Sequence, residues 1–102
     1  MHKPSHNSYY EATIQIRPFS QEVIQYVLDE ITKRKDVFIA KTEKLKTGLD
    51  VFVSSQRFAR ALGKKLNDNF DGVLTISKKI NRLDRQTGVV LYRATVLFRL
   101  KQ

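Results

Sequence analysis

The sequence predicts an α+β fold in which two helices lie on one face of a largely antiparallel sheet. Two stretches carry apolar residues at helical spacing, whereas five others have strand character, most of them alternating apolar and polar residues. The expected order is β-α-β-β-α-β-β, and its first six elements follow the split βαβ architecture with one added strand. Helices that each bury one apolar stripe can share one face of a sheet, which gives a two-layer sandwich.

Residues 9–102 are expected to form a single domain, preceded by a flexible tail at residues 1–8. A chain of 102 residues with 41% hydrophobic and 28% charged residues has the composition of one compact domain. The tail is polar, and its two histidines have no neighbouring ligand with which to hold a metal. No apolar run approaches the ~20 residues that span a bilayer.

The beginning of the chain changes from strand spacing to helical spacing. Residues 9–17, "YYEATIQIR", alternate apolar and polar residues, so one face of this strand is expected to be buried. That face comprises Tyr10, Ala12, Ile14 and Ile16. A helix over residues 20–35 follows, with Ser20 as its N-cap and basic residues in its last turn, where they complement the helix dipole. Its apolar stripe comprises Val23, Ile24, Val27, Leu28 and Ile31.

Two hairpins are predicted, one on each side of a second helix. Residues 37–45 and 49–54 form the first, and Gly48 supplies the positive φ that a short hairpin favours. The stretches "VLTISKKINRLD" and "VVLYRATVLFRL" flank "RQTG" and form the second, longer hairpin. One face of its last strand is mixed in character, and is therefore partly exposed or covered by a partner: Val89, Leu91, Arg93, Thr95, Leu97 and Arg99.

The second helix lies between the hairpins and is capped by Ser54 or Ser55. Its buried side comprises Phe58, Ala59, Leu62, Leu66 and Phe70. Ala59 and Gly63 are small enough to let this helix approach the sheet closely, which gives a reason for a glycine that costs roughly 1 kcal/mol against alanine within a helix.

Groups for catalysis and metal binding are scarce. The chain has no cysteine, both histidines lie in the tail, and no serine stands beside a histidine. The acids are scattered singly, and the four glycines form no phosphate-binding loop motif. The sequence therefore predicts a non-catalytic protein that holds neither a metal nor a cofactor.

The charge of the chain predicts contact with nucleic acid. Nineteen basic residues against ten acidic ones give a formal net charge of +9. The cations gather on the second helix and on the two hairpins. The residues expected to contact RNA are Arg57, Arg60, Lys64, Lys65, Lys78, Lys79, Arg82, Arg85, Gln86, Lys44 and Lys46.

The second helix carries its cations on one side, because Arg57, Arg60 and Lys64 recur at helical spacing. No acid lies between residues 56 and 66, and the free backbone N–H groups at the start of the helix favour a phosphate. The chain lacks the paired aromatic motifs of an RNA-recognition sheet, so contact with RNA shape and backbone is expected. The alternative interpretations are a solvated helix face and a hairpin tip kept soluble by charge.

Three stretches together resemble an internal domain of the large-subunit ribosomal export adaptor family, also called nonsense-mediated mRNA decay protein three. These are "YYEATIQIR", "GLDVFVSSQRFARALGKKL" and "LDRQTGVVLYRATVLFRL", and the likeness covers about residues 9–100. The archaeal form is the most similar. The resemblance implies a non-catalytic factor that binds the large ribosomal subunit, serving assembly in archaea and export in eukaryotes.

The same resemblance implies a domain similar in fold to an α/β protein of the large ribosomal subunit, in agreement with the predicted sandwich. The zinc-binding CxxC repeats of the family lie upstream of this domain and are absent from the sequence. No zinc is therefore carried over, and the chain is expected to be a fragment or a single domain of a longer protein, with a stand-alone relative as the alternative.

Two functional hypotheses follow. The first is a cytoplasmic, ribosome-associated domain that contacts the rRNA backbone and ribosomal proteins of the large subunit, with no membrane and no small-molecule substrate. The alternative is a protein-interaction domain with incidental positive charge, which docks through the mixed face of the last strand. One positive face formed by the second helix and both hairpin tips favours RNA binding, whereas tips that point apart weaken it.

Overall fold

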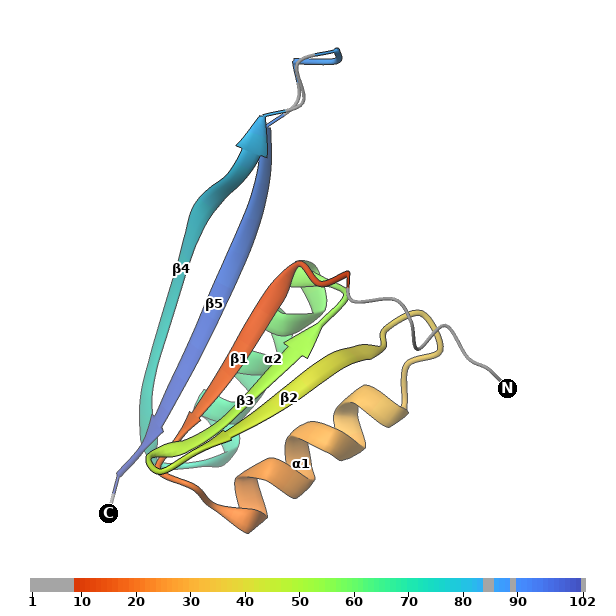
Figure 1. Ribbon diagram of the computed structural model, residues 1–102. Helices are drawn as coiled ribbons and strands as arrows, with labels where there is room; N and C mark the ends of the chain where they lie inside the picture. The colour runs from red at the N-terminus through yellow and green to blue at the C-terminus, as the bar shows by residue number, and fades with distance from the viewer. Residues whose placement is uncertain (1–8, 84–85, 89, 102) are drawn as a thin grey trace.

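The structure, a computed structural model, describes residues 9–83, 86–88 and 90–101, although not the side chains of residues 81–83 and 91. The predicted tail at residues 1–8 lies outside this part. The elements are β1 (Ala12–Arg17), α1 (Gln21–Thr32), β2 (Ile39–Leu45), β3 (Gly48–Val53), α2 (Gln56–Asn69), β4 (Gly72–Leu83) and β5 (Val90–Leu100) (Figure 1). Their order confirms the predicted α+β fold.

The sheet has the strand order β2-β3-β1-β5-β4. β1 pairs with β3 in antiparallel and with β5 in parallel orientation, and both hairpins are antiparallel. In this order β5, the strand added to the split βαβ arrangement, is inserted between β1 and β4. The strand that follows α2 is therefore displaced to the edge of the sheet.

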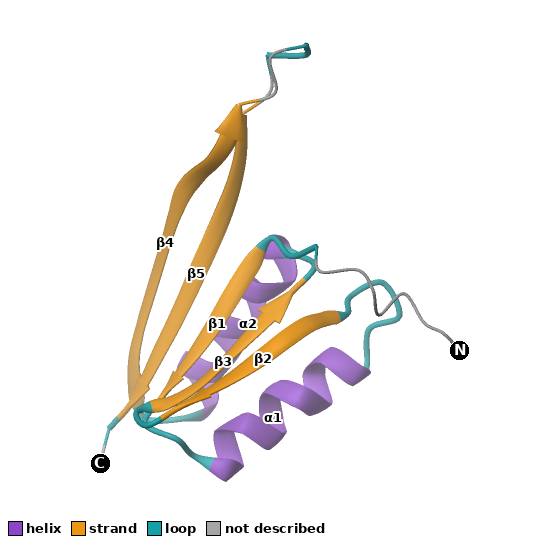
Figure 2. Cartoon of the chain, in the orientation of Figure 1, coloured by secondary structure: helices purple, strands orange, loops and turns teal. Residues whose placement is uncertain are grey.

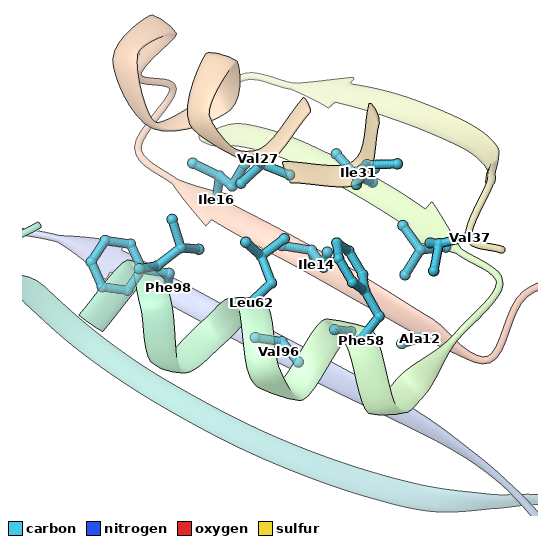
Figure 3. Packing of buried hydrophobic residues seen from close by; sticks show 14 of the residues in the cluster. Ala12, Ile14, Ile16, Val27, Ile31, Val37, Phe58, Leu62, Val96 and Phe98 are labelled. Atoms are coloured by element: carbon cyan, nitrogen blue, oxygen red, sulfur yellow. The ribbon is translucent and has the colours of Figure 1, made fainter. Parts of the chain in front are cut away.

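Both helices lie on the same face of the sheet (Figures 1 and 2). The core between the two layers is made by alternate residues of β1, β3 and β5 and by the apolar stripes of the helices (Figure 3). The residues that are wholly buried include Ile14, Ile16, Val27, Leu66, Val96 and Phe98. The opposite face of the sheet carries neither helix, and we call it the uncovered face.

The helix boundaries differ by a few residues from the predicted ones. Ser20 and Ser55 are the N-caps, and their hydroxyl oxygens accept hydrogen bonds from the backbone N–H groups of Val23 and Phe58. α1 ends at Thr32, so the basic residues 33–35 lie beyond the helix, whereas the sequence predicts them in its last turn. The backbone N–H of Lys33 closes the helix by donating to the Asp29 carbonyl.

Two glycines are required by close approach. A Cβ on Gly63 would lie 2.7 Å from Cγ1 of Val96 and 3.0 Å from Cδ1 of Leu74. α2 therefore packs so closely against β5 and β4 that this position has no room for a side chain. A Cβ on Gly48 would lie 1.9 Å from the carbonyl oxygen of Ile16. Gly48 has a φ of 157°, and it is this contact with β1, more than a tight-turn conformation, that requires glycine there.

The strands of the β4–β5 hairpin, with 12 and 11 residues, are longer than the other three strands of the sheet. The β1 register begins at Ala12, which pairs with Ala94, and Ala94 in turn pairs with Lys78 of β4. Residues 79–83 and 90–93 therefore extend past the beginning of β1, and we call them the arm (Figure 1). A register shift between Ile80 and Arg82 lies within the arm.

Replacing Gly63 by leucine is expected to lower the free energy of unfolding by about 1–3 kcal/mol, because the new side chain would overpack a helix–sheet contact that has no room for a Cβ. Ala61→Leu, at an exposed position of the same helix, is the matched control and should have little effect. Urea denaturation followed by circular dichroism measures both variants. Equal stability of the two variants would show that α2 does not need a glycine to approach the sheet.

Candidate nucleic-acid interface

The outer side of α2 presents the cations that the spacing predicts. Arg57 and Lys64 are exposed, and no acid in the described part of the chain forms an ion pair with either. Arg60 is half-buried, and its Nη1 donates a hydrogen bond to Oε1 of Gln56 at 3.2 Å. Two of the three guanidinium and ammonium groups on this side are thus available to an external anion.

Lys65 has a different neighbour from the other cations of α2. Its Nζ lies 2.8 Å from Oε1 of Glu30 on α1, and Nζ of Lys33 lies 2.8 Å from the other oxygen of the same carboxylate. Glu30 is only 7% exposed. Hydrogen bonds first from Lys33 and then from Lys65 hold the pKa of Glu30 below its ordinary value of 4.5. Lys65 therefore joins the two helices.

The N-terminus of α2 is already occupied by a carboxylate. Oε1 of Glu11, just before β1, accepts a hydrogen bond from the backbone N–H of Gln56 at 3.0 Å, and Ser55 accepts one from Phe58 at 3.1 Å. The expectation of free N–H groups for a phosphate at this helix end is therefore wrong. A negative charge is indeed favoured there, but the chain supplies it itself.

The two hairpin tips lie at opposite ends of the sheet (Figure 1). The tip between β2 and β3 lies beside the end of β1, since Gly48 contacts Ile16, whereas the arm extends past the beginning of β1. The three basic elements therefore do not form one face. By the criterion set from the sequence, this separation weakens the argument that all three bind RNA together.

The described candidates at the two tips are exposed. Lys44 and Lys46 are exposed in the first hairpin, where Nζ of Lys44 lies 4.9 Å from the ring centroid of Phe19. In the second, Gln86 is exposed in the turn. Arg85 lies outside the described residues, as does the side chain of Arg82 in β4.

Lys78 and Lys79 point to opposite faces of β4. Lys78 pairs with the buried Ala94 and shares the helix side, where its Nζ lies 4.7 Å from the ring centroid of Tyr92. Lys79 pairs with Arg93 on the uncovered face.

The root of the arm lies near the beginning of α2. Leu74 of β4 contacts α2 at Gly63, and four strand residues beyond Leu74 span about 13 Å. Six helical residues from Gly63 back to Arg57 span about 9 Å in the same direction. Lys78 is thus brought towards the start of α2. We call Arg57, Arg60, Lys64 and Lys78 the helix-side basic surface.

The uncovered face carries a row of cations and aromatic rings that sequence reasoning missed. Nζ of Lys41 lies 4.7 Å from the ring centroid of Phe52, and the rings of Phe52 and Tyr10 meet edge to face at 4.9 Å. The guanidinium of Arg93 lies 3.9 Å from the ring centroid of Tyr10. This row crosses from β2 to β5.

Tyr10 was expected on the buried face of a strand, and this expectation is wrong. β1 begins only at Ala12, so Tyr10 does not share the alternation that buries Ala12 and Ile14. Its ring packs instead with Phe52, whose register partner Thr13 lies on the uncovered face. The clue in the sequence is Arg93, an arginine within a strand on a face of mixed character.

The fold and its charge define the chain as a small basic α+β domain. The family model described as NMD3, second domain, matches residues 9–100, and the chain therefore belongs to this family. Membership implies a ribosome-related adaptor role, and the family is associated with the large ribosomal subunit. This confirms the resemblance noted in the sequence, while the archaeal type stays a prediction. No curated protein matches the chain.

Two further properties concern the described part of the chain. Neither of its helices has the length and apolar character that a membrane crossing needs. Within the same residues, no three histidine, cysteine or acidic side chains are grouped so that they could hold a metal ion.

Acid is expected to weaken the contact between the two helices. The lowered pKa of Glu30 means that its carboxylate stabilises the fold above pH 4.5 and that this contribution is lost as the pH falls through the folded-state pKa. Glu30→Gln should therefore show a smaller loss of stability between pH 6 and pH 3 than the unmodified chain, as measured by urea denaturation at each pH. Glu22→Gln, at an exposed site on the same helix, is the control. Identical pH profiles for Glu30→Gln and the unmodified chain would contradict this role.

Proposed function

We propose that the chain is a non-catalytic domain of a large-subunit assembly or export adaptor that contacts the rRNA backbone and ribosomal proteins in the cytoplasm. The observation that carries the proposal is that most acidic side chains are paired within the fold, whereas several basic side chains have no acidic partner in the described part of the chain. Five of the acids lie within 3.6 Å of a lysine or arginine nitrogen: Glu30, Asp36, Glu43, Asp50 and Asp71. Glu11 is bound to the start of α2.

The acids are thus largely taken up by contacts within the fold, and a surplus of cations is left at the surface. On the helix-side basic surface, Arg57, Lys64 and Lys78 have no acidic partner in the described part of the chain. Phosphate oxygens are the anions that rRNA presents most densely, and neutralising them releases counterions into solution. An exposed surface of unpaired cations therefore supports contact with the backbone more than readout of bases.

The double variant Arg57→Glu, Lys64→Glu is expected to bind a folded fragment of large-subunit rRNA about tenfold or more weakly, since two phosphate contacts become repulsive. Fluorescence anisotropy over a series of salt concentrations measures this. The slope of log affinity against log salt should also become shallower by roughly 1.8, because each lost phosphate contact removes about 0.9 from a duplex slope.

The control for net charge is Lys35→Glu, Lys101→Glu, which changes the same number of charges at exposed positions outside the helix-side basic surface. It should keep most of the affinity and of the salt slope. Should both double variants lose affinity equally, α2 would have no special part in binding. An affinity for the large subunit that does not vary with salt would favour the alternative, a protein-interaction domain with incidental charge.

A further inference from the structure

A cleft of about 320 Å³ lies where the arm leaves the body of the sheet, largely on the uncovered face. It faces away from the helix-side basic surface, because Thr13, Thr95 and Lys79 alternate with residues that face the helices. Its lining includes Tyr10, Thr13, Lys79, Ile80, Arg93 and Thr95. Segments from both ends of the chain thus build one hollow.

The register of the sheet places hydroxyls beside cations in this cleft. Thr13 of β1 pairs with Thr95 of β5, and Lys79 of β4 pairs with Arg93 two residues earlier in β5. Lys79 is exposed and forms no ion pair with any acid in the described part of the chain. Two hydroxyl donors next to an ammonium group suit an anion with several oxygen atoms, such as a phosphate.

The other side of the cleft is planar. Arg93 is held in place, because its Nε donates to the Tyr10 carbonyl at 3.1 Å, its Nη1 donates to the Tyr10 hydroxyl at 3.3 Å, and its guanidinium stacks on the Tyr10 ring. Ile80 also borders the cleft, but it pairs with Tyr92, so its side chain shares the helix side with Lys78. A planar stack contributes nothing to the binding of an isolated phosphate, but it suits a nucleobase.

We propose that this cleft binds one unpaired nucleotide of RNA. Its phosphate contacts Lys79 and the hydroxyls of Thr13 and Thr95, and its base packs against the stacked Arg93. Pockets for small ligands begin at about 300 Å³, so the volume of this cleft is sufficient for one nucleotide. The inference rests on the proposed function and adds to it a second contact, on the face opposite to α2, that distinguishes unpaired from paired RNA.

An acidic protein segment is the other occupant that the cations would allow. Carboxylates would satisfy Lys79 and the threonines equally well, but they leave the planar wall of Arg93 and Tyr10 without a partner. The combination of charge, hydroxyls and a planar wall therefore favours a nucleotide.

The test compares a single-stranded oligouridylate with an RNA duplex of the same length, using fluorescence anisotropy on the full chain. The variant Lys79→Gln, Thr95→Val removes the charge and one hydroxyl, and it should bind the single strand about five- to tenfold more weakly while its affinity for the duplex changes less than about twofold. Its salt slope for the single strand should become shallower by about 0.7, the value for one phosphate. Circular dichroism checks that the variant is folded.

The neighbouring lysine provides the matched control. Lys78→Gln removes the same charge from the next position of β4, but on the helix side, so it should lower the affinities for both RNAs in similar proportion. The measured quantity is the ratio of the affinity for the single strand to that for the duplex, which only the cleft variant should change. Amide chemical shifts of Thr13, Arg93 and Thr95 on addition of the oligouridylate should locate the contact.

Three other outcomes overturn the inference in distinguishable ways. If duplex RNA binds and the ratio is unchanged in the cleft variant, the cleft takes no nucleotide, but the proposed function stands. If the chain binds neither RNA, the proposed function fails as well. The third outcome concerns an oligoglutamate peptide. If it shifts the amide signals of Thr13, Arg93 and Thr95 and displaces labelled oligouridylate at a lower concentration than unlabelled oligouridylate does, the occupant is an acidic protein segment.

Discussion

The parallel pairing of β1 with β5 is the contact on which the other features of this domain depend. It inserts β5 between β1 and β4 and so moves the strand after α2 to the sheet edge. Its register, from Ala12 with Ala94 to Arg17 with Arg99, aligns the buried side chains of both strands beneath the helices. Because β1 is short, the same register leaves the β4–β5 hairpin unsupported beyond Ala94, and the arm results.

The residues just before β1 link this pairing to both faces. Glu11 continues the pairing, since its carbonyl accepts from the backbone N–H of Ala94, and its carboxylate binds the start of α2. Tyr10 turns to the uncovered face, where Arg93 stacks on its ring. One two-residue segment thus connects the arm, the second helix and the sheet. It also explains why a phosphate is not expected at the helix N-terminus, while cations remain exposed further along α2.

The two RNA contacts that we propose lie on opposite faces of the domain, an arrangement that suits an adaptor. The helix-side basic surface consists mainly of cations without acidic partners in the described part of the chain, which suits an RNA backbone of any sequence. The cleft of the uncovered face combines charge with hydroxyls and a planar wall, which suits an unpaired nucleotide. Because the two hairpin tips lie at opposite ends, any engagement of the first tip, with Lys44 and Lys46, would require a separate partner or a large surface such as a ribosomal subunit presents.

The sequence by itself determined the seven elements, the buried stripes, the net charge and the family, because each depends on local periodicity, on composition or on the order of residues along the chain. Only the tertiary structure decided that Lys65 pairs with Glu30, that Glu11 caps α2, that Tyr10 leaves the core face, and that the hairpin tips point apart. These contacts join groups far apart in sequence: Arg93 and Tyr10 are 83 residues from each other. No local pattern specifies such a pair, since it arises only when the order and register of the strands are set.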